Sequence, residues 1–247
     1  MASVYAACAC GSRHAAEACC PSGVSRRAML RGGALLTGAA IAGWGAELAW
    51  PAAAQAQTQM TPDQALQTMM EGNKRFTQGQ MTSFNEDLKM LKEHTAEGQA
   101  PFAAVLSCAD SRVPVELVFD QTIGHLFVCR VAGNIATADL IASLEYGVAV
   151  LGAKAIMVLG HGSCGAVDAT IKAKAVPGQI SVLYRSIRPA VEQAGPNLEA
   201  ATKANAKIQA GLLASSSPVI AEAIKNNQLK VVPAYYELAT GAVTLTA

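Results

Sequence analysis

Four short apolar runs constrain the fold of this chain more than any other feature of its sequence. They span residues 102–107, 125–131, 155–160 and 229–236. Each run is too short and too uniformly apolar for a surface helix, and is typical of a strand buried inside a sheet. Residues 138–151, between the second and third runs, carry apolar side chains at helical spacing. Because strand, helix and strand alternate, the sequence predicts an α/β fold with a mostly parallel sheet.

Further helices are predicted around this frame. The segment Thr61-Pro62-Asp63-Gln64 combines an N-cap residue, a proline at the first helical position and a capping-box glutamine. A weaker helical pattern spans residues 85–97, and further helices are predicted over residues 165–175, 197–213 and 218–226. Residues 235–238, the turn at 239–241 and residues 243–245 are expected to form a closing strand or hairpin.

Residues 1–56 have the pattern of an export signal. Arg26 and Arg27 form a twin-arginine pair, residues 32–50 are moderately apolar, and Ala54-Gln55-Ala56 offers small residues to a signal peptidase. A membrane anchor is the alternative, but the apolar run contains Glu47 and several glycines. We therefore expect a cleaved twin-arginine signal, a periplasmic or otherwise exported protein with no membrane attachment after cleavage, and a single domain over residues 57–247.

The number of cysteines and the net charge of that domain exclude some classes of function. Cleavage after Ala56 removes four of the seven cysteines and leaves Cys108, Cys129 and Cys164. An odd number of cysteines argues against a disulfide framework and favours thiolates held in another way, such as by a metal. Residues 57–247 contain 15 Lys and Arg against 16 Asp and Glu. The domain therefore lacks the basic surface of a nucleic-acid-binding protein.

Two motifs place metal-ligand residues at the ends of predicted strands. Cys108, Asp110 and Arg112 follow the first strand, whereas His161 and Cys164 follow the third. Open α/β sheets bind ligands at the carboxyl ends of parallel strands, so the two motifs are expected to converge there. An extended backbone would point the three alternating residues of the first motif to one side. Two thiolates and an imidazole are typical zinc ligands.

These motifs resemble the two zinc-binding signatures of the β-class carbonic anhydrases. They are Cys108-Ala109-Asp110-Ser111-Arg112-Val113 and His161-Gly162-Ser163-Cys164-Gly165-Ala166-Val167. The resemblance extends over most of residues 57–247, through residues 72–76, 119–121, 130–134, 145–146 and 234–241. It implies a sheet of about four strands flanked by helices, and an N-terminal helical arm that embraces a partner. The implied assembly is a homodimer or a higher even-numbered oligomer.

The resemblance also implies the reaction and its residues. Zinc would be held by Cys108, His161 and Cys164, with water or Asp110 as the fourth ligand. The implied activity is the reversible hydration of carbon dioxide to bicarbonate and a proton, by attack of zinc-bound hydroxide. Arg112 would fix Asp110, which would accept the hydroxide's proton in a hydrogen bond and direct the attack.

Four further residues are assigned to the substrate pocket by the resemblance alone. Gln99 matches a glutamine that hydrogen-bonds the substrate in plant-like members, and the backbone amide at the position of Gly165 contacts the substrate. Phe127 and Tyr146 match pocket residues that help to form the site across the dimer interface. Members with a regulatory bicarbonate site carry a tryptophan where this chain has Val105. The resemblance therefore implies the open, plant-like subtype.

Several alternatives stay open at this point. The same zinc site could serve a carbonyl sulfide or carbon disulfide hydrolase, and His161 could instead activate Cys108 or Cys164 in a thiol enzyme. A closed structural zinc site with Asp110 as fourth ligand would make the chain a non-catalytic zinc-binding protein. Arg130 is expected to pair across a dimer rather than to act in catalysis.

Overall fold

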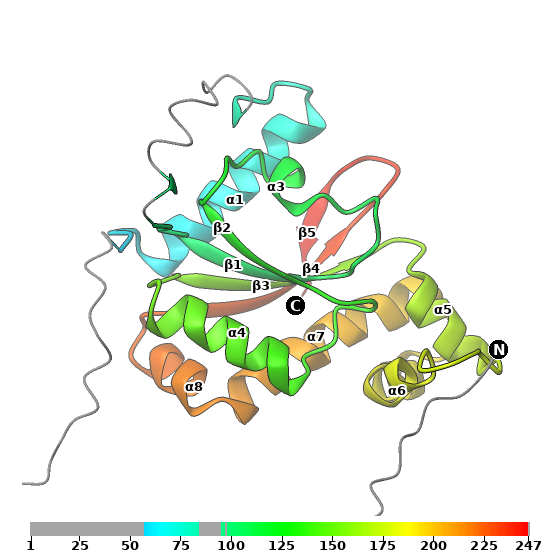
Figure 1. Ribbon diagram of the computed structural model, residues 1–247. Coiled ribbons are helices and arrows are strands. Elements are labelled where there is room, and N and C mark those ends of the chain that lie inside the picture. Colours follow the sequence, from blue (N-terminus) through cyan, green and yellow to red (C-terminus); the bar gives the residue numbers. More distant parts are fainter. Residues whose placement is uncertain (1–56, 84–94, 97, 247) are drawn as a thin grey trace, which may run out of the picture. The chain divides into compact units, whose positions relative to one another are not determined.

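The computed structural model describes residues 57–83, 95–96 and 98–246 (Figure 1). The predicted signal and nearly all of the predicted helix over residues 85–97 lie outside these described residues. Within the described part of the chain, no helix is both long enough and apolar enough to cross a bilayer.

A five-stranded sheet in the order β2-β1-β3-β4-β5 forms the centre of the domain. The first four strands pair in parallel, and β5 is antiparallel to β4. This confirms the predicted α/β class, and β5 is the predicted closing strand, which adds a fifth to the expected sheet of about four. The strands are β1 (Ala103–Ser107), β2 (Leu126–Arg130), β3 (Ala155–His161), β4 (Lys230–Tyr236) and β5 (Val243–Leu245).

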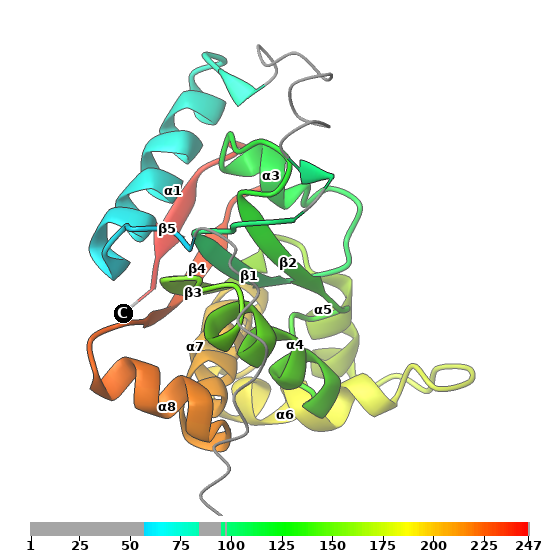
Figure 2. The same ribbon diagram turned by 60° about the vertical axis from the view of Figure 1, so that its left-hand side comes forward.

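Helices cover both faces of this sheet (Figures 1 and 2). On one face, α1 and α3 pack against alternate strand residues in one apolar core, and α4, α7 and α8 pack against the other face in a second core. A third, smaller apolar cluster joins α5 and α6 to the carboxyl end of β1. The helices are α1 (Pro62–Thr77), α3 (Val115–Val118), α4 (Ala138–Ala149), α5 (Gly165–Lys172), α6 (Val182–Ala194), α7 (Leu198–Ser216) and α8 (Pro218–Lys225).

Helix α1 begins as predicted and is fastened to the sheet by one buried amide. Thr61 and Gln64 form the expected capping box. Further along, Asn73 Nδ2 donates to the carbonyls of Val118 (3.0 Å) and Gly241 (2.9 Å), and Asn73 Oδ1 accepts from the amide of Val243 (2.8 Å). A single side chain therefore links α1, α3 and the β4–β5 connection.

Helix α6 was not predicted from the sequence. Pro189 lies inside it, and a proline within a run of apolar residues ordinarily argues against a helix because it lacks an amide hydrogen. The helix nevertheless forms around Ile187, whose side chain is fully buried and packs in the same cluster as Cys108 and Cys164. Tertiary packing thus outweighs the local cost of the proline, and α6 becomes part of the wall behind the predicted metal ligands.

The register of the parallel strands explains why the two motifs meet. Strands β1 and β3 are neighbours, and Ser107 at the end of β1 pairs with Leu159 near the end of β3. The residues that follow each strand therefore emerge at the same edge of the sheet. This edge carries Cys108 and His161.

Candidate metal centre

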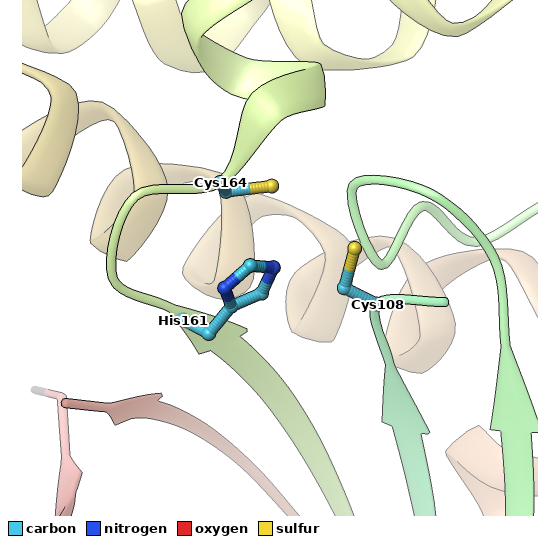
Figure 3. A group of neighbouring side chains, drawn as sticks. All are labelled: Cys108, His161 and Cys164. Atoms are coloured by element: carbon cyan, nitrogen blue, oxygen red, sulfur yellow. The ribbon is translucent and has the colours of Figure 1, made fainter. Parts of the chain in front are cut away.

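Three buried side chains converge at this edge of the sheet (Figure 3). Cys108 follows β1, His161 ends β3 and Cys164 immediately precedes α5. The two sulfur atoms and a ring nitrogen all lie within 4.8 Å of one another. The prediction that the two motifs converge is confirmed.

The hydrogen bonding of His161 leaves one ring nitrogen free to bind a metal. Nδ1 lies 2.8 Å from the carbonyl oxygen of Gly162. A carbonyl only accepts, so we assign the ring hydrogen to Nδ1 and a lone pair to Nε2. His161 Nε2 is buried and has no hydrogen-bond partner, which is costly unless another group such as a metal ion binds there.

The sulfur atoms of Cys108 and Cys164 lie close together and change each other's pKa. The hydrogen bond from the Cys164 thiol, opposed by burial, lowers the pKa of Cys108 to about 4. The same contact and burial raise the pKa of Cys164, although backbone amides at the start of α5 oppose this. Cys108 therefore loses its proton readily, and a bound cation would favour the thiolate form of both sulfurs. With the Nε2 lone pair, these sulfurs form a donor set that fits zinc.

A carboxylate lies beside the cluster and is held by an arginine fork. Arg112 Nε donates to Asp110 Oδ1 at 2.9 Å and Arg112 Nη2 donates to Asp110 Oδ2 at 2.8 Å. Asp110 Oδ2 is also 3.9 Å from His161 Nε2. The hydrogen bond from Arg112, against a smaller effect of burial, holds the pKa of Asp110 well below its usual range. The carboxylate is therefore ionised at neutral pH and adjacent to the metal-ligating nitrogen.

The backbone in this motif differs from the predicted extended form. Asp110 and Val113 form a turn in which the amide of Val113 donates to the carbonyl of Asp110 at 3.1 Å. Arg112 is brought to Asp110 by this turn, which also lets the Arg112 amide donate to Asp110 Oδ1 at 2.9 Å. Asp110 and Arg112 therefore contact each other as predicted, but a turn and not an extended backbone brings them together.

Arg130 has a role in the centre that the sequence did not reveal. Its Nε donates to the carbonyl of Cys108 at 3.0 Å and its Nη2 to the carbonyl of Asp110 at 2.5 Å. Arg130 ends β2 and pairs in register with Ser107, which places its side chain next to the loop that follows β1. The arginine thus fixes the loop that carries both a metal ligand and the carboxylate, whereas the predicted pairing across a dimer stays a prediction.

The four predicted substrate residues fall into two groups. Gly165 directly follows Cys164 and is exposed. Phe127 and Tyr146 contact each other, with ring centroids 6.4 Å apart, and Gln99 is exposed ahead of β1. Among the described residues, no hydrogen bond or ring contact joins these last three to the metal-ligand cluster. The assignment of all four residues to the substrate pocket stays a prediction.

The domain also contains a cavity that lies away from the metal-ligand cluster. It has a volume of about 360 Å³ and lies between α8 and the turn that joins α4 to β3, with Lys154 and Glu222 in its wall. None of its lining residues belongs to the metal-ligand cluster or the Asp110–Arg112 pair. The converging donors, and not this cavity, identify the candidate site.

Comparison with known proteins matches this centre to one family. A family model described as carbonic anhydrase matches residues 103–243. Carbonic anhydrase 2 of Mycobacterium tuberculosis is 32% identical over 198 residues, which cover 74% of this chain and 92% of that protein.

Solved structures agree with the fold. A Coccomyxa β-carbonic anhydrase in complex with acetazolamide is similar with a TM-score of 0.57 and 28% identity, covering 64% of this chain and 77% of that one. A tetrameric β-carbonic anhydrase from Sordaria macrospora has a TM-score of 0.61 and 23% identity, covering 65% of this chain and 87% of that one.

Proposed function

Because the chain belongs to the β-class carbonic anhydrases, we propose a specific form of that activity for it. The chain is a zinc enzyme that hydrates carbon dioxide reversibly to bicarbonate and a proton. In the proposed form it works outside the cytoplasmic membrane, as an open, plant-like member whose reaction is directed by Asp110 and Arg112. The observation that carries the proposal is the carboxylate that Arg112 holds beside three converging metal-ligand atoms.

Zinc would be held by Cys108, His161 and Cys164. When bound, it lowers the pKa of water in its open coordination position to about 7 and so supplies a nucleophile near neutral pH. Buried residues of α5, α6 and the loop after β2 pack against Cys108 and Cys164. Asp110, beside these ligands, is partly exposed.

Asp110 has the geometry of an orienting group. Arg112 binds both carboxylate oxygens, and Arg130 holds the carbonyl of the same residue. The carboxylate can therefore accept a hydrogen bond from the attacking oxygen without rotating away, and the lone pair of that oxygen is directed at carbon dioxide. Because Arg112 also donates to the carbonyl of Ser163 at 3.2 Å, the pair is tied to both zinc-binding motifs.

The substrate pocket is proposed to be completed by a second copy of the chain. Phe127 lies on β2, an edge strand of the sheet, and Tyr146 beside it is 44% exposed. An exposed aromatic residue next to an open edge strand is suited to a subunit interface. The Sordaria relative is a tetramer, which supports a homodimer or a higher even-numbered oligomer here. Gln99 and the backbone amide of Gly165 are the proposed polar contacts to bicarbonate.

The open subtype is supported by the state of Asp110. Both of its oxygens are engaged by Arg112, and Val105 is a small, fully buried residue of β1. An Asp110 committed to Arg112 leaves the fourth zinc position to water. A crystal structure of the zinc enzyme above pH 8 that shows Asp110 bound directly to zinc would contradict this subtype.

Export is proposed on the pattern of residues 1–56 alone. We expect the wild-type chain to be recovered outside the cytoplasmic membrane with Gln57 as its first residue. Replacing Arg26 and Arg27 together by lysine should retain the full-length chain inside the cell. N-terminal sequencing of the two fractions tests both points, and an uncleaved wild-type chain in the membrane fraction would instead support an anchor.

Substrate preference is tested with the zinc-loaded protein itself. Turnover of carbon dioxide and of carbonyl sulfide is measured in one preparation under the same conditions. We expect carbon dioxide hydration to be much the faster reaction. A faster turnover of carbonyl sulfide would contradict the proposed physiological substrate while leaving the zinc chemistry in place.

A further inference from the structure

Two amide side chains on α7 lie behind the metal centre. Asn205 is 0% exposed and Gln209 is 1% exposed. Burying an amide is costly unless its donors and acceptors are satisfied. The partners of these two residues therefore indicate what they hold in place.

Both amides hydrogen-bond to the loop that follows β2, at Gly133 and Ala136; this segment is called the clamped loop below. Asn205 Nδ2 donates to the carbonyl of Gly133 at 2.8 Å, and Gln209 Oε1 accepts from the amide of Ala136 at 2.9 Å. Gln209 Nε2 also donates to Asn205 Oδ1 at 3.2 Å and to the carbonyl of Ser186 at 3.1 Å. The two side chains thus form one network that clamps the loop at two points and ties it to α6.

The clamped loop contacts a metal ligand directly. The amide of Gly133 donates to Cys108 Sγ at 3.3 Å. Gly133 has a φ of 77°, in the left-handed region, and a Cβ at this position would lie 2.7 Å from Ile187 Cδ1. The loop therefore approaches the sulfur in a backbone conformation that favours glycine, and the Gly133 carbonyl is held by Asn205.

We propose that Asn205 and Gln209 are positioning residues that act through Gly133 to tune Cys108 as a zinc ligand. A hydrogen bond to a ligating sulfur draws charge away from it, and outer hydrogen bonds of this kind orient metal ligands and set metal affinity. The effect matters in a site with two thiolates, because their combined charge makes zinc a weaker Lewis acid. The inference rests on the zinc centre of the proposed function, but not on export or on the role of Asp110.

The test uses near-isosteric variants of the full chain. Asn205→Leu removes the donor to Gly133, and Gln209→Met removes the bonds to Ala136, Asn205 and Ser186 with little change in volume. Zinc dissociation constants are measured by competition with a chelator, and the cobalt-substituted proteins give the energy of the sulfur-to-cobalt charge-transfer band. We expect Asn205→Leu to raise the zinc dissociation constant about tenfold and to shift the band to lower energy. Gln209→Met should change both in the same direction by less.

Asn73 provides a matched control. It is a buried asparagine with three hydrogen bonds, to Val118, Gly241 and Val243, none of which is a metal ligand or part of the clamped loop. Asn73→Leu should lower the free energy of unfolding while leaving the cobalt band and the zinc dissociation constant unchanged.

The outcomes are distinct. Wild-type values of both the cobalt band and the zinc dissociation constant in Asn205→Leu and Gln209→Met would overturn the inference, as would an equal shift in Asn73→Leu. If Asn205→Leu does not fold, Gln209→Met decides alone. A zinc-loaded wild-type chain that fails to hydrate carbon dioxide would contradict the proposed function, whereas the cobalt and zinc measurements would still decide this inference.

Discussion

Two aspartate–arginine pairs in this domain carry the same charges, yet their surroundings differ. In one, Asp110 is bound by Arg112 beside the metal ligands, with side chains 18% and 52% exposed. In the other, Asp120 is bound by Arg75 at 2.5 Å, with side chains 0% and 33% exposed. Both carboxyl groups have pKa values held well below the usual range.

The partners separate the roles of the two carboxylates. Burial alone would raise the pKa of Asp120, but hydrogen bonds from Ser83, Arg75 and Thr82 outweigh it. Asp120 accepts from the Thr82 and Ser83 amides at 2.9 Å, from the Thr82 hydroxyl at 3.0 Å and from Arg75, so its oxygens are fully engaged in joining segments of the fold. Asp110 is bound chiefly by one arginine and stays partly open. A lowered pKa is therefore shared by the carboxylate that joins segments of the fold and by the carboxylate that we propose acts in catalysis, and their positions distinguish them.

Replacing each aspartate by asparagine separates the two pairs, and the largest expected effect is the loss of carbon dioxide hydration in Asp110→Asn. Asp110→Asn removes the charge that is proposed to orient the attacking oxygen, so we expect the kcat/KM for carbon dioxide hydration to fall by at least about 100-fold. Zinc content and melting temperature should stay near the wild-type values, because the pair is partly open to solvent and such pairs contribute little to stability. Stopped-flow hydration with zinc quantified in each sample measures this.

Asp168 is the control for this exchange. It lies on α5, close in sequence to Cys164, and forms an exposed pair with Lys172. Asp168→Asn should leave hydration unchanged. Wild-type activity in Asp110→Asn would contradict the proposed catalytic role of Asp110, and with it the difference in role between Asp110 and Asp120.

Asp120→Asn is expected to show the opposite pattern. The exchange leaves hydrogen-bond donors from Arg75, Thr82 and Ser83 without a charged acceptor, and such bonds contribute about 2–3 kcal/mol when lost from a buried site. The free energy of unfolding in urea should fall by about that amount, whereas hydration per bound zinc should stay near wild type. A large loss of activity in folded, zinc-loaded Asp120→Asn would place this pair in the catalytic machinery.

The three cysteines are expected to differ in how fast they oxidise. Cys108 and Cys164 are a close, coupled pair at the metal centre, whereas burial in the core raises the pKa of Cys129. Because thiolates oxidise faster than thiols, metal-stripped protein should lose its free-thiol titre in air faster than zinc-bound protein, and Cys129 should stay reduced. Thiol titration followed by peptide mapping measures this. Equal loss from all three cysteines would contradict it.

The smallest expected effect is on the pH dependence of stability. The pKa of Asp120 is lower in the folded than in the unfolded chain, so its contribution is present above the ordinary value of about 3.9 and is lost as the pH falls through the folded value. The stability difference between wild type and Asp120→Asn should therefore shrink between about pH 5 and pH 2. Urea unfolding of both metal-stripped proteins measures it, and a difference that grows toward acid would contradict the assignment.

The sequence was sufficient for the parts of the site that depend on strand order. Apolar runs placed Cys108 and His161 at strand ends, and parallel neighbours bring such ends together. It was insufficient for contacts between side chains and distant carbonyls, such as those of Arg130, because these depend on three-dimensional register. The internal Pro189 concealed α6 for a related reason, since tertiary packing and not local propensity decides that helix.

The segment 72–76 was identified from the sequence only by its resemblance to the family, and its structural role was not predicted. Gly72 is required because a Cβ there would lie 1.8 Å from the carbonyl oxygen of Phe119, and Asn73 joins three elements. Neither reason can be read from periodicity. The signal, the subunit contacts and the substrate roles of Gln99, Phe127, Tyr146 and Gly165 stay predictions.

The most direct test of the account is a titration of metal-stripped, reduced protein with zinc, with the carbon dioxide hydration rate measured at each step. If Cys108, His161 and Cys164 form one catalytic centre, the rate should rise in proportion to bound zinc and reach its plateau at one zinc per chain. A rate that stays at the uncatalysed value with one zinc bound, or that does not depend on zinc, would contradict the account.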